Sequence, residues 1–99
     1  MAHVGDIDAL VFTAHALRQM FARSITLEAV RTTVYEGETI ARYPTDQPYP
    51  SRLLLGWTEG RPLHVVMAHD PASRRGYVVT AYVPDATHWT DDFKTRRFS

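Results

Sequence analysis

The 99-residue sequence predicts a single α+β domain over residues 1–99, with an N-terminal helical hairpin packed on an antiparallel sheet of about four strands. Two observations predict this class. Apolar residues recur at helical spacing over residues 14–36, and from residue 38 onward the period of the pattern becomes two. With 44% hydrophobic residues the chain can bury a core, and with no cysteine it has neither disulfides nor thiolate metal ligands.

Two helices with a tight connection are predicted over residues 14–36. Thr13 and Thr26 are the expected N-caps, because a threonine hydroxyl accepts from the free backbone N–H groups of a first turn. Gly37 supplies the C-terminal stop of the second helix. The faces expected to meet the sheet are Ala14, Leu17, Met20 and Phe21 in the first helix, and Leu27, Val30 and Val34 in the second.

The strands follow from the period-two pattern and from the turn residues between them. Proline-rich residues 44–50 and the turns at 58–61 and 70–73 separate the apolar runs. The predicted strands are residues 38–43, 52–57, 63–69 and 77–83. Residues 88–99 are expected to form a short helix or an irregular tail.

The charge is balanced overall, with ten arginines, one lysine and eleven acidic residues. Zero net charge argues against a generic DNA-coating protein, which is normally basic. The arginine excess has two explanations: arginine codon usage in a GC-rich genome, or the use of the guanidinium group to hold phosphate and stack on bases. Residues 71–99 carry five basic and three acidic residues, a local excess of two positive charges.

No targeting segment and no membrane span are expected. Residues 1–6 lack a basic start that leads into an apolar run, and no apolar stretch approaches the roughly 20 residues that cross a bilayer. A cytoplasmic location is therefore predicted.

Among side chains that could carry chemistry, His15 and Arg18 are three residues apart on the polar face of the first predicted helix. An imidazole beside a guanidinium suits a phosphodiester, because histidine moves a proton near neutral pH and arginine holds the phosphate charge. The alternative is an ordinary solvated helix face. His64 and His69 are five apart in one strand and should point to opposite faces, so no metal site is expected.

The last strand presents a pair of hydroxyl groups, from Thr80 and Tyr82, on one face. In a regular strand Val78 shares that face and Tyr77 points the other way. Arg74 and Arg75 lie in the preceding turn, where they either form a solvated loop or clamp a backbone phosphate.

The segment Thr13–Ile25 resembles the opening signature of the DUF4258 family. The shared pattern is a histidine, an arginine three residues on, a methionine, a second arginine and an isoleucine. Here these are His15, Arg18, Met20, Arg23 and Ile25. The resemblance extends over about residues 10–97. It continues through residues 26–30, 37–38, 62–66 and 79–82, Arg52, Trp89 and the Arg96–Arg97 pair.

This family is similar to the RelE/ParE-like toxins of bacterial toxin–antitoxin pairs. The resemblance implies a compact fold and an endoribonuclease that acts on mRNA, free or on the ribosome, without a metal or another cofactor. It also implies a cognate antitoxin, a small protein of helix-turn-helix or zinc-finger character. The family supplies no catalytic assignment, so the roles that follow are our hypotheses.

In these hypotheses His15 is the general base or acid, Arg18 clamps the phosphate, and Tyr82 is a second proton donor or an orienting hydroxyl. The residues expected to guide the RNA backbone are Arg23, Arg52, Arg74 and Arg75. Two alternatives stay open: a non-catalytic protein-binding module that uses the face of His15 and Arg18 and the sheet edge, and a toxin that inhibits a non-RNA target such as gyrase.

Overall fold

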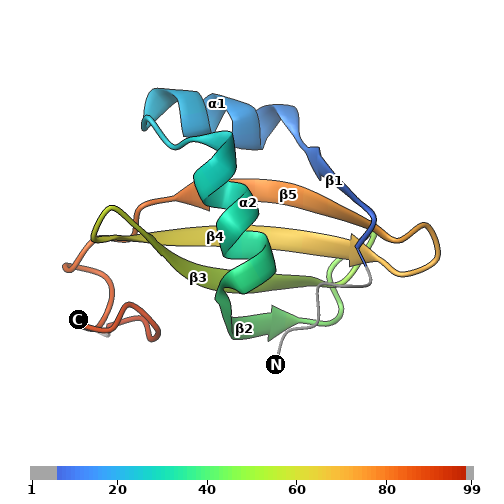
Figure 1. The fold of residues 1–99 in the computed structure, drawn as a ribbon. Helices are drawn as coiled ribbons and strands as arrows, with labels where there is room; N and C mark the ends of the chain where they lie inside the picture. The colour runs from blue at the N-terminus through green and yellow to red at the C-terminus, as the bar shows by residue number, and fades with distance from the viewer. Residues whose placement is uncertain (1–6, 98–99) are drawn as a thin grey trace.

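The computed structural model describes residues 7–97. Residues 1–6, on which the expectation of no targeting segment partly rests, and residues 98–99 of the predicted tail lie outside the described residues. The elements follow in the order β1 (Ala9–Phe12), α1 (Ala14–Ala22), α2 (Leu27–Glu36), β2 (Glu38–Tyr43), β3 (Ser51–Thr58), β4 (Arg61–Asp70) and β5 (Arg75–Tyr82). Both helices lie against one face of a single sheet (Figure 1).

The predicted fold class is wrong in two respects. A strand precedes the helices, so the helical pair lies in the middle of the chain, and the sheet is mixed, with the five-strand order β1-β5-β4-β3-β2. β1 pairs in parallel with β5, and the other neighbours are antiparallel. β1 has four residues, and its partner begins 66 positions later, with Ala9 opposite Arg75. So short a run, paired so far along the chain, leaves no local signal.

The helix boundaries and caps are confirmed. The Thr13 hydroxyl accepts from Ala16 N at 3.1 Å, and the Thr26 hydroxyl accepts from Ala29 N at 3.0 Å. Thr13 also donates to the carbonyl of Val78 at 3.0 Å, which fixes the start of α1 beside β5. The Gly37 N–H donates to Thr33 O and ends α2.

The predicted apolar face of α1 is confirmed at Met20 and wrong at Leu17 and Phe21. The helix buries Ala16 and Met20, whereas Leu17 is 46% exposed and Phe21 is 90% exposed. The anchoring of Thr13 to β5 sets how α1 is turned about its axis, and helical spacing alone does not carry this information. In α2 the buried residues are Val30, Thr33 and Val34, so only Leu27 departs from the prediction.

One hydrophobic core lies between the helices and the sheet. The buried residues that form it are Ile7, Ala16, Met20, Ile25, Val30, Val34, Leu54, Leu63, Val65, Met67, Val78 and Ala81. α2 approaches β3 closely, because Gly56 has no side chain: a Cβ there would lie 2.2 Å from the Thr33 hydroxyl. Burial of these side chains is the dominant favourable term in the folding of the domain.

The opposite face of the sheet is covered at its two ends by non-helical chain. At one end Tyr49, from the loop after β2, stacks on Tyr77 with 5.6 Å between ring centroids. The other end is covered by residues 85–97, which we call the C-terminal segment. Trp89 of this segment packs against His64, with 4.4 Å between the ring centroids. The fold therefore has helices on one face and two short covers on the other.

A bulge in β5 corrects the predicted side-chain alternation. Val78 pairs with Met67 and Thr80 with Val66, so Val79 is an extra residue on this strand. The bulge moves Val78 into the core and puts Tyr77 on the same side of the sheet as Tyr82.

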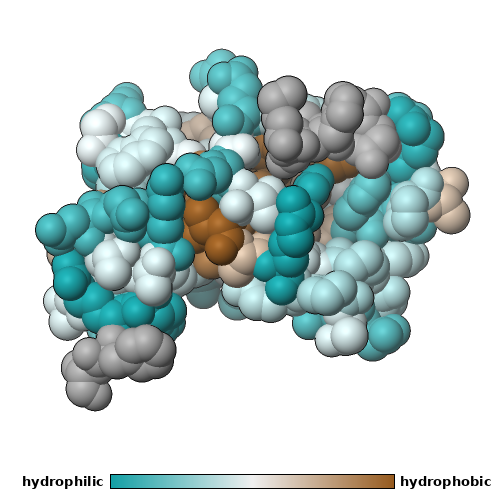
Figure 2. All heavy atoms as spheres, turned by 90° about the horizontal axis from the view of Figure 1, so that it is seen from below, coloured by the Kyte–Doolittle hydropathy of each residue, from teal (hydrophilic) through white to brown (hydrophobic). Residues whose placement is uncertain are grey.

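The surface around β2, seen from below in Figure 2, is mostly hydrophilic and holds a small hydrophobic patch. Neither helix of the described chain is long and apolar enough to cross a membrane.

Candidate functional site

Three segments meet to form a cleft of about 330 Å³ beside the end of β5. They are the end of α1, the last residue of β5 with the chain that follows it, and the C-terminal segment. The lining residues are Arg23, Tyr82, Val83, Pro84, Asp85, His88, Trp89 and Arg96. We call this the basic cleft, since it contains two guanidinium groups and an imidazole for one carboxylate.

The path of α1 brings Arg23 to the cleft. The helix starts at Thr13, beside Val78, and runs toward the end of β5 that carries Tyr82. The backbone N–H of Arg23 donates to Gln19 O at 3.1 Å and closes the last turn. Ser24 then adopts a positive φ of 57°, which turns the chain sharply toward α2 and leaves the exposed Arg23 at the corner.

His88 and Asp85 form a hydrogen-bonded pair in the cleft. The imidazole Nδ1 lies 2.9 and 3.0 Å from the two carboxylate oxygens of Asp85. The hydrogen bond from His88 lowers the pKa of Asp85, so this carboxylate is ionised at neutral pH and Nδ1 is the donor. In the neutral ring Nε2 is then a proton acceptor. A carboxylate that orients an imidazole in this way is the arrangement that supports a general base.

Tyr82 is held by a fully buried histidine. His64 Nε2 lies 2.8 Å from the carbonyl oxygen of Phe93 and donates to it, so Nδ1 accepts from the Tyr82 hydroxyl at 3.2 Å. Burial lowers the pKa of His64, against the opposing effect of the hydrogen bond to Phe93. Burial also raises the pKa of the Tyr82 phenol, although the charge of Arg96 acts the other way. At neutral pH both groups are therefore uncharged.

The C-terminal segment closes the cleft as a small folded unit. Trp89 is buried against His64, and the guanidinium carbon of Arg96 lies 5.5 Å from the Trp89 ring centroid. Arg97 stabilises the segment internally, because its guanidinium group donates hydrogen bonds to Asp91 at 2.7 Å and to the carbonyl of Ala86 at 3.0 Å. Arg96 is thereby placed over an aromatic ring at the rim, where a cation–π contact holds it.

The structure brings together two of the residues that the sequence singled out, Arg23 and Tyr82. His15 and Arg18 are exposed on α1 and do not line the cleft.

The other predicted RNA-guiding arginines lie elsewhere. Arg74 binds Asp8 at 2.8 Å, and Arg75 begins β5, seven residues and about 23 Å before Tyr82. Arg52 pairs with Met67 and so faces the helix side of the sheet, whereas Tyr82 faces the other side.

Several residues of the cleft were not assigned a role from the sequence. Asp85 directly follows Pro84, and His88 lies three residues further on, a spacing that allows the aspartate of a turn to bond the histidine. This spacing could have predicted the pair from the sequence. No local pattern predicts the contact of His64 with Tyr82 or the place of Arg96, because both depend on how Trp89 packs against the sheet.

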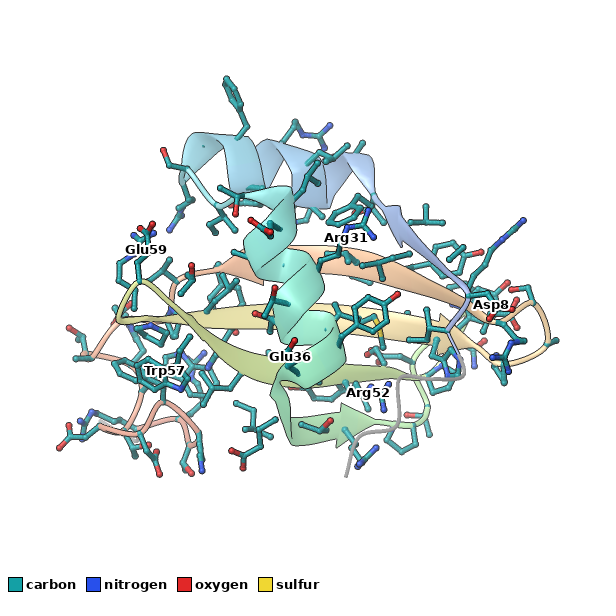
Figure 3. All side chains as sticks on the ribbon, viewed as in Figure 1. Asp8, Arg31, Glu36, Arg52, Trp57 and Glu59 are labelled. Atoms are coloured by element: carbon teal, nitrogen blue, oxygen red, sulfur yellow. The ribbon has the colours of Figure 1, made fainter. Side chains whose placement is uncertain are left out.

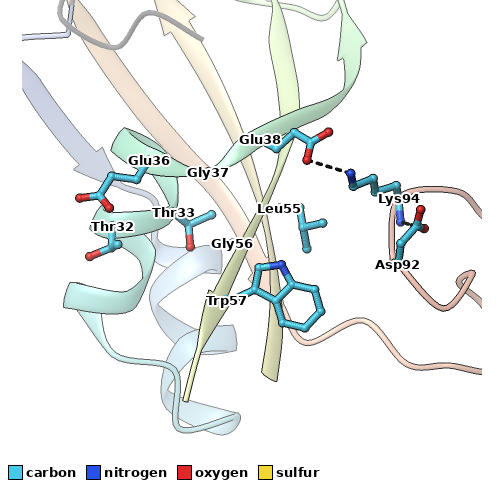
Figure 4. A pocket seen from close by; sticks show the side chains of 10 residues that line it. All are labelled: Thr32, Thr33, Glu36, Gly37, Glu38, Leu55, Gly56, Trp57, Asp92 and Lys94. Atoms are coloured by element: carbon cyan, nitrogen blue, oxygen red, sulfur yellow. Dashed lines mark hydrogen bonds and ion pairs between the residues drawn. The ribbon is translucent and has the colours of Figure 1, made fainter. Parts of the chain in front are cut away.

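A second cavity, of about 510 Å³, lies on the other side of the C-terminal segment (Figure 4). Its charged lining residues are Glu36, Glu38, Asp92 and Lys94, and we call it the acidic cavity. Lys94 bridges to Glu38 at 3.1 Å. Trp57, which is 57% exposed, forms one wall (Figures 3 and 4). Among residues 7–97, no three histidine, aspartate or glutamate side chains are grouped in a way that could hold a metal ion.

Comparison with known proteins gives one match. The model of a family described as a domain of unknown function, DUF4258, matches residues 12–83, which include α1 and the strand that carries Tyr82. No curated protein and no solved structure matches the chain significantly. Since the family model covers most of the sequence, the chain belongs to the DUF4258 family.

Proposed function

We propose that this protein is an endoribonuclease that cleaves single-stranded RNA in the basic cleft, without a metal, and acts as the toxin of a toxin–antitoxin pair. One observation supports this most strongly. A carboxylate-oriented imidazole, a phenol and two guanidinium groups line the same 330 Å³ cleft. These are a base, an acid and a phosphate clamp, the groups that cleavage by the RNA's own 2′-hydroxyl requires.

In the proposed reaction the Nε2 atom of His88 takes the proton of the 2′-hydroxyl, and Asp85 stabilises the resulting imidazolium. The 2′-oxygen then forms a bond to the adjacent phosphorus while the bond to the 5′-oxygen breaks. The products are a 2′,3′-cyclic phosphate and a 5′-hydroxyl end. Arg23 and Arg96 hold the non-bridging oxygens, where negative charge grows in the transition state.

Tyr82 completes the reaction by donating its phenolic proton to the leaving 5′-oxygen. Its raised pKa keeps the phenol protonated before the step. The hydroxyl turns from His64 Nδ1 to the leaving group, and exchange with water returns a proton to Tyr82 and removes one from His88. His64 is a positioning residue, since it touches Tyr82 and not the RNA.

Cleavage of a labelled single-stranded RNA in the presence of a chelator tests the activity. We expect cyclic-phosphate ends, and a loss of rate of about 10²-fold or more in His88→Ala. His15→Ala is the matched variant, because the sequence alone predicted that His15 is the base. A large loss in His15→Ala with full activity in His88→Ala would move the reaction to the face of α1, and intact RNA with the wild-type protein would exclude a ribonuclease.

The proposed toxin role has its own test, in growing cells. Expression of the chain alone in bacteria should stop growth and degrade transcripts, and His88→Ala should restore growth at the same protein level. Normal growth with intact transcripts at high levels of folded protein would rule this role out.

A protein-binding module is the second candidate, favoured by the exposure of large apolar side chains on the helical pair. Phe21 is 90% exposed, and Leu17 and Leu27 are about half exposed. Exposed apolar side chains that lie together on a protein surface often mark a site that binds another protein. Stable complex formation with a partner protein that is lost in Phe21→Ser, with no cleavage of RNA, would favour this function over the ribonuclease.

A further inference from the structure

We infer that the protein binds a guanine base of its RNA in another cavity, of about 430 Å³, on the face of the sheet opposite the helices. We call it the tyrosine cavity, because Tyr49 and Tyr77 line it. Its volume lies in the range of about 300–1,000 Å³ that is typical of small-ligand sites. The inference rests on the proposed function, because the base belongs to a strand whose phosphates lie in the basic cleft.

The strand register places the tyrosine cavity beside the basic cleft, on the same face of the sheet. The strand residues that line it include Val66, Ala68 and Tyr77. In β4, Val66 lies two residues after His64 and two before Ala68, so these three side chains share one face. His64 pairs with Tyr82, which lines the basic cleft. The floor of the tyrosine cavity therefore begins about 7 Å along β4 from the residue pair that reaches the basic cleft.

A pair of aromatic rings forms one wall of the tyrosine cavity. The rings of Tyr49 and Tyr77 are nearly parallel, with 6° between their planes and 5.6 Å between their centroids. The other apolar residues of the lining are Pro48, Val66, Ala68 and Val79. Unpaired RNA bases bind proteins by stacking on aromatic side chains in this way. The wall therefore suits a planar ring system.

Asp46 and Ser51 supply polar groups to the same cavity. The Ser51 hydroxyl donates to Asp46 Oδ2, which holds the carboxylate at the lining. A carboxylate has about four acceptor sites, so this hydrogen bond does not exhaust Asp46. Guanine carries two adjacent N–H donors, on N1 and N2, that match a carboxylate as the fork of an arginine does. The Watson–Crick edges of adenine, cytosine and uracil each have one position that donates, beside an acceptor, so the carboxylate selects guanine.

An arginine side chain of a partner protein has related chemistry, because a guanidinium group also offers a planar fork of donors and stacks on aromatic rings. Two observations favour the base. The cavity has room for a whole bicyclic ring, and it shares a face of the sheet with the basic cleft. Methylguanidinium is therefore the competing ligand in the test.

The base site is tested by titrating the protein with the four ribonucleosides and with methylguanidinium, followed by nuclear magnetic resonance. Nucleosides have no phosphate, so the basic cleft does not contribute. We expect guanosine to bind about tenfold or more tightly than the other three nucleosides, and Asp46→Asn to lose this preference. The amide of this variant still accepts from Ser51, but its NH₂ group opposes the donors of guanine.

Glu59→Gln is the matched control, because Glu59 is an exposed carboxylate in the turn between β3 and β4 and does not line the tyrosine cavity. It should keep the preference for guanosine. Equal binding of the four nucleosides, an equal preference in wild type and Asp46→Asn, or Asp46-dependent binding of methylguanidinium alone would overturn the inference.

The link to RNA is tested with two short 2′-O-methyl strands of uridines that differ only in one central base, guanine or adenine. These strands lack the attacking hydroxyl and stay intact. The wild-type protein should bind the guanine strand about tenfold or more tightly. Asp46→Asn should bind the two strands equally. Arg23→Gln/Arg96→Gln should bind both strands more weakly and keep the difference between them.

The two sets of variants separate the base site from the proposed ribonuclease site. Weaker binding in Arg23→Gln/Arg96→Gln without an Asp46-dependent preference for guanine would overturn the tyrosine cavity and leave the ribonuclease proposal standing. An Asp46-dependent preference that persists while the arginine variant binds both strands at full affinity would uphold the base site and contradict the basic cleft.

Discussion

The basic cleft and the acidic cavity lie on the two sides of the same C-terminal segment, and their charges are opposite. The first is lined by two arginines, a histidine and one carboxylate, and the second by three carboxylates and the single lysine. The segment thus separates the charges of a chain whose net charge is zero. A total charge of zero therefore does not exclude an anionic ligand, because folding brings residues of like charge from distant parts of the chain to one surface.

The two sides are also held differently. On the basic side the buried His64 anchors the segment through its contacts with Trp89 and with the carbonyl of Phe93, and it also accepts a hydrogen bond from Tyr82 of β5. On the acidic side an exposed ion pair links Lys94 to Glu38, and Phe93 makes an edge-to-face contact with Trp57. We therefore expect changes on the basic side to cost more stability than changes on the acidic side.

His64→Ala should have the largest effect. It opens a cavity in the sheet face and leaves the Tyr82 hydroxyl and the carbonyl of Phe93 without their partner, so the free energy of unfolding should fall by about 3 kcal/mol or more. Urea unfolding measures this. The exposed His15→Ala should lie within about 0.5 kcal/mol of the wild type. A small loss in His64→Ala would show that the segment is anchored elsewhere.

Gly56→Ala should come next and should affect the floor of the acidic cavity. The new Cβ would lie 2.2 Å from the Thr33 hydroxyl, so α2 and β3 must move apart, at a cost of about 2–3 kcal/mol. The double variant Gly56→Ala/Thr33→Ala removes the Thr33 hydroxyl and methyl groups and leaves only the Thr33 Cβ, at 2.9 Å, close to the new Cβ. Its loss should therefore be smaller than the sum of the two single losses. Additive losses would mean that the close approach of Thr33 is not the cause.

Acidification should weaken the basic side first. Burial lowers the pKa of His64 below that of an unfolded histidine, near 6.5, so the unfolded chain binds more protons as the pH falls. The stabilisation is fully present above about pH 7 and is lost as the pH falls toward the lowered pKa, with a slope of up to about 1.4 kcal/mol per pH unit. Urea titrations between pH 7.5 and 5 measure this slope, and His64→Gln should flatten it. An unchanged slope in His64→Gln would assign the effect to another group.

Lys94→Met should have the smallest effect. Both partners of the pair with Glu38 are substantially exposed, so its loss should change the free energy of unfolding by less than about 1 kcal/mol. The effect should shrink further in high salt. A loss comparable to that of His64→Ala would reverse the order of the two sides.

Local sequence patterns were sufficient to predict the caps Thr13 and Thr26 and four of the strands, to within about two residues. These features depend on neighbours in the chain. β1, the rotation of α1 that exposes Phe21, and the bulge at Val79 were not predicted, since each depends on pairing with β5 or β4 far along the sequence.

The residues of the candidate site also fall into those that the sequence indicated and those that depend on distant contacts. Arg23 and Tyr82 were singled out from the sequence, and the structure places both in the basic cleft. Arg96 joins them only because Trp89 packs on His64 across the sheet, a contact between residues 25 positions apart that no periodicity indicates.

The central claim, that the basic cleft and not the acidic cavity binds RNA, is tested most directly by titrating a fluorescent single-stranded RNA with three proteins. Arg23→Gln/Arg96→Gln should bind about tenfold or more weakly than the wild type, and the slope of log affinity against log salt should fall by about 1.4. Glu36→Gln/Glu38→Gln should bind as the wild type does, or slightly more tightly. Equal losses in the two double variants, or full affinity without Arg23 and Arg96, would contradict the account.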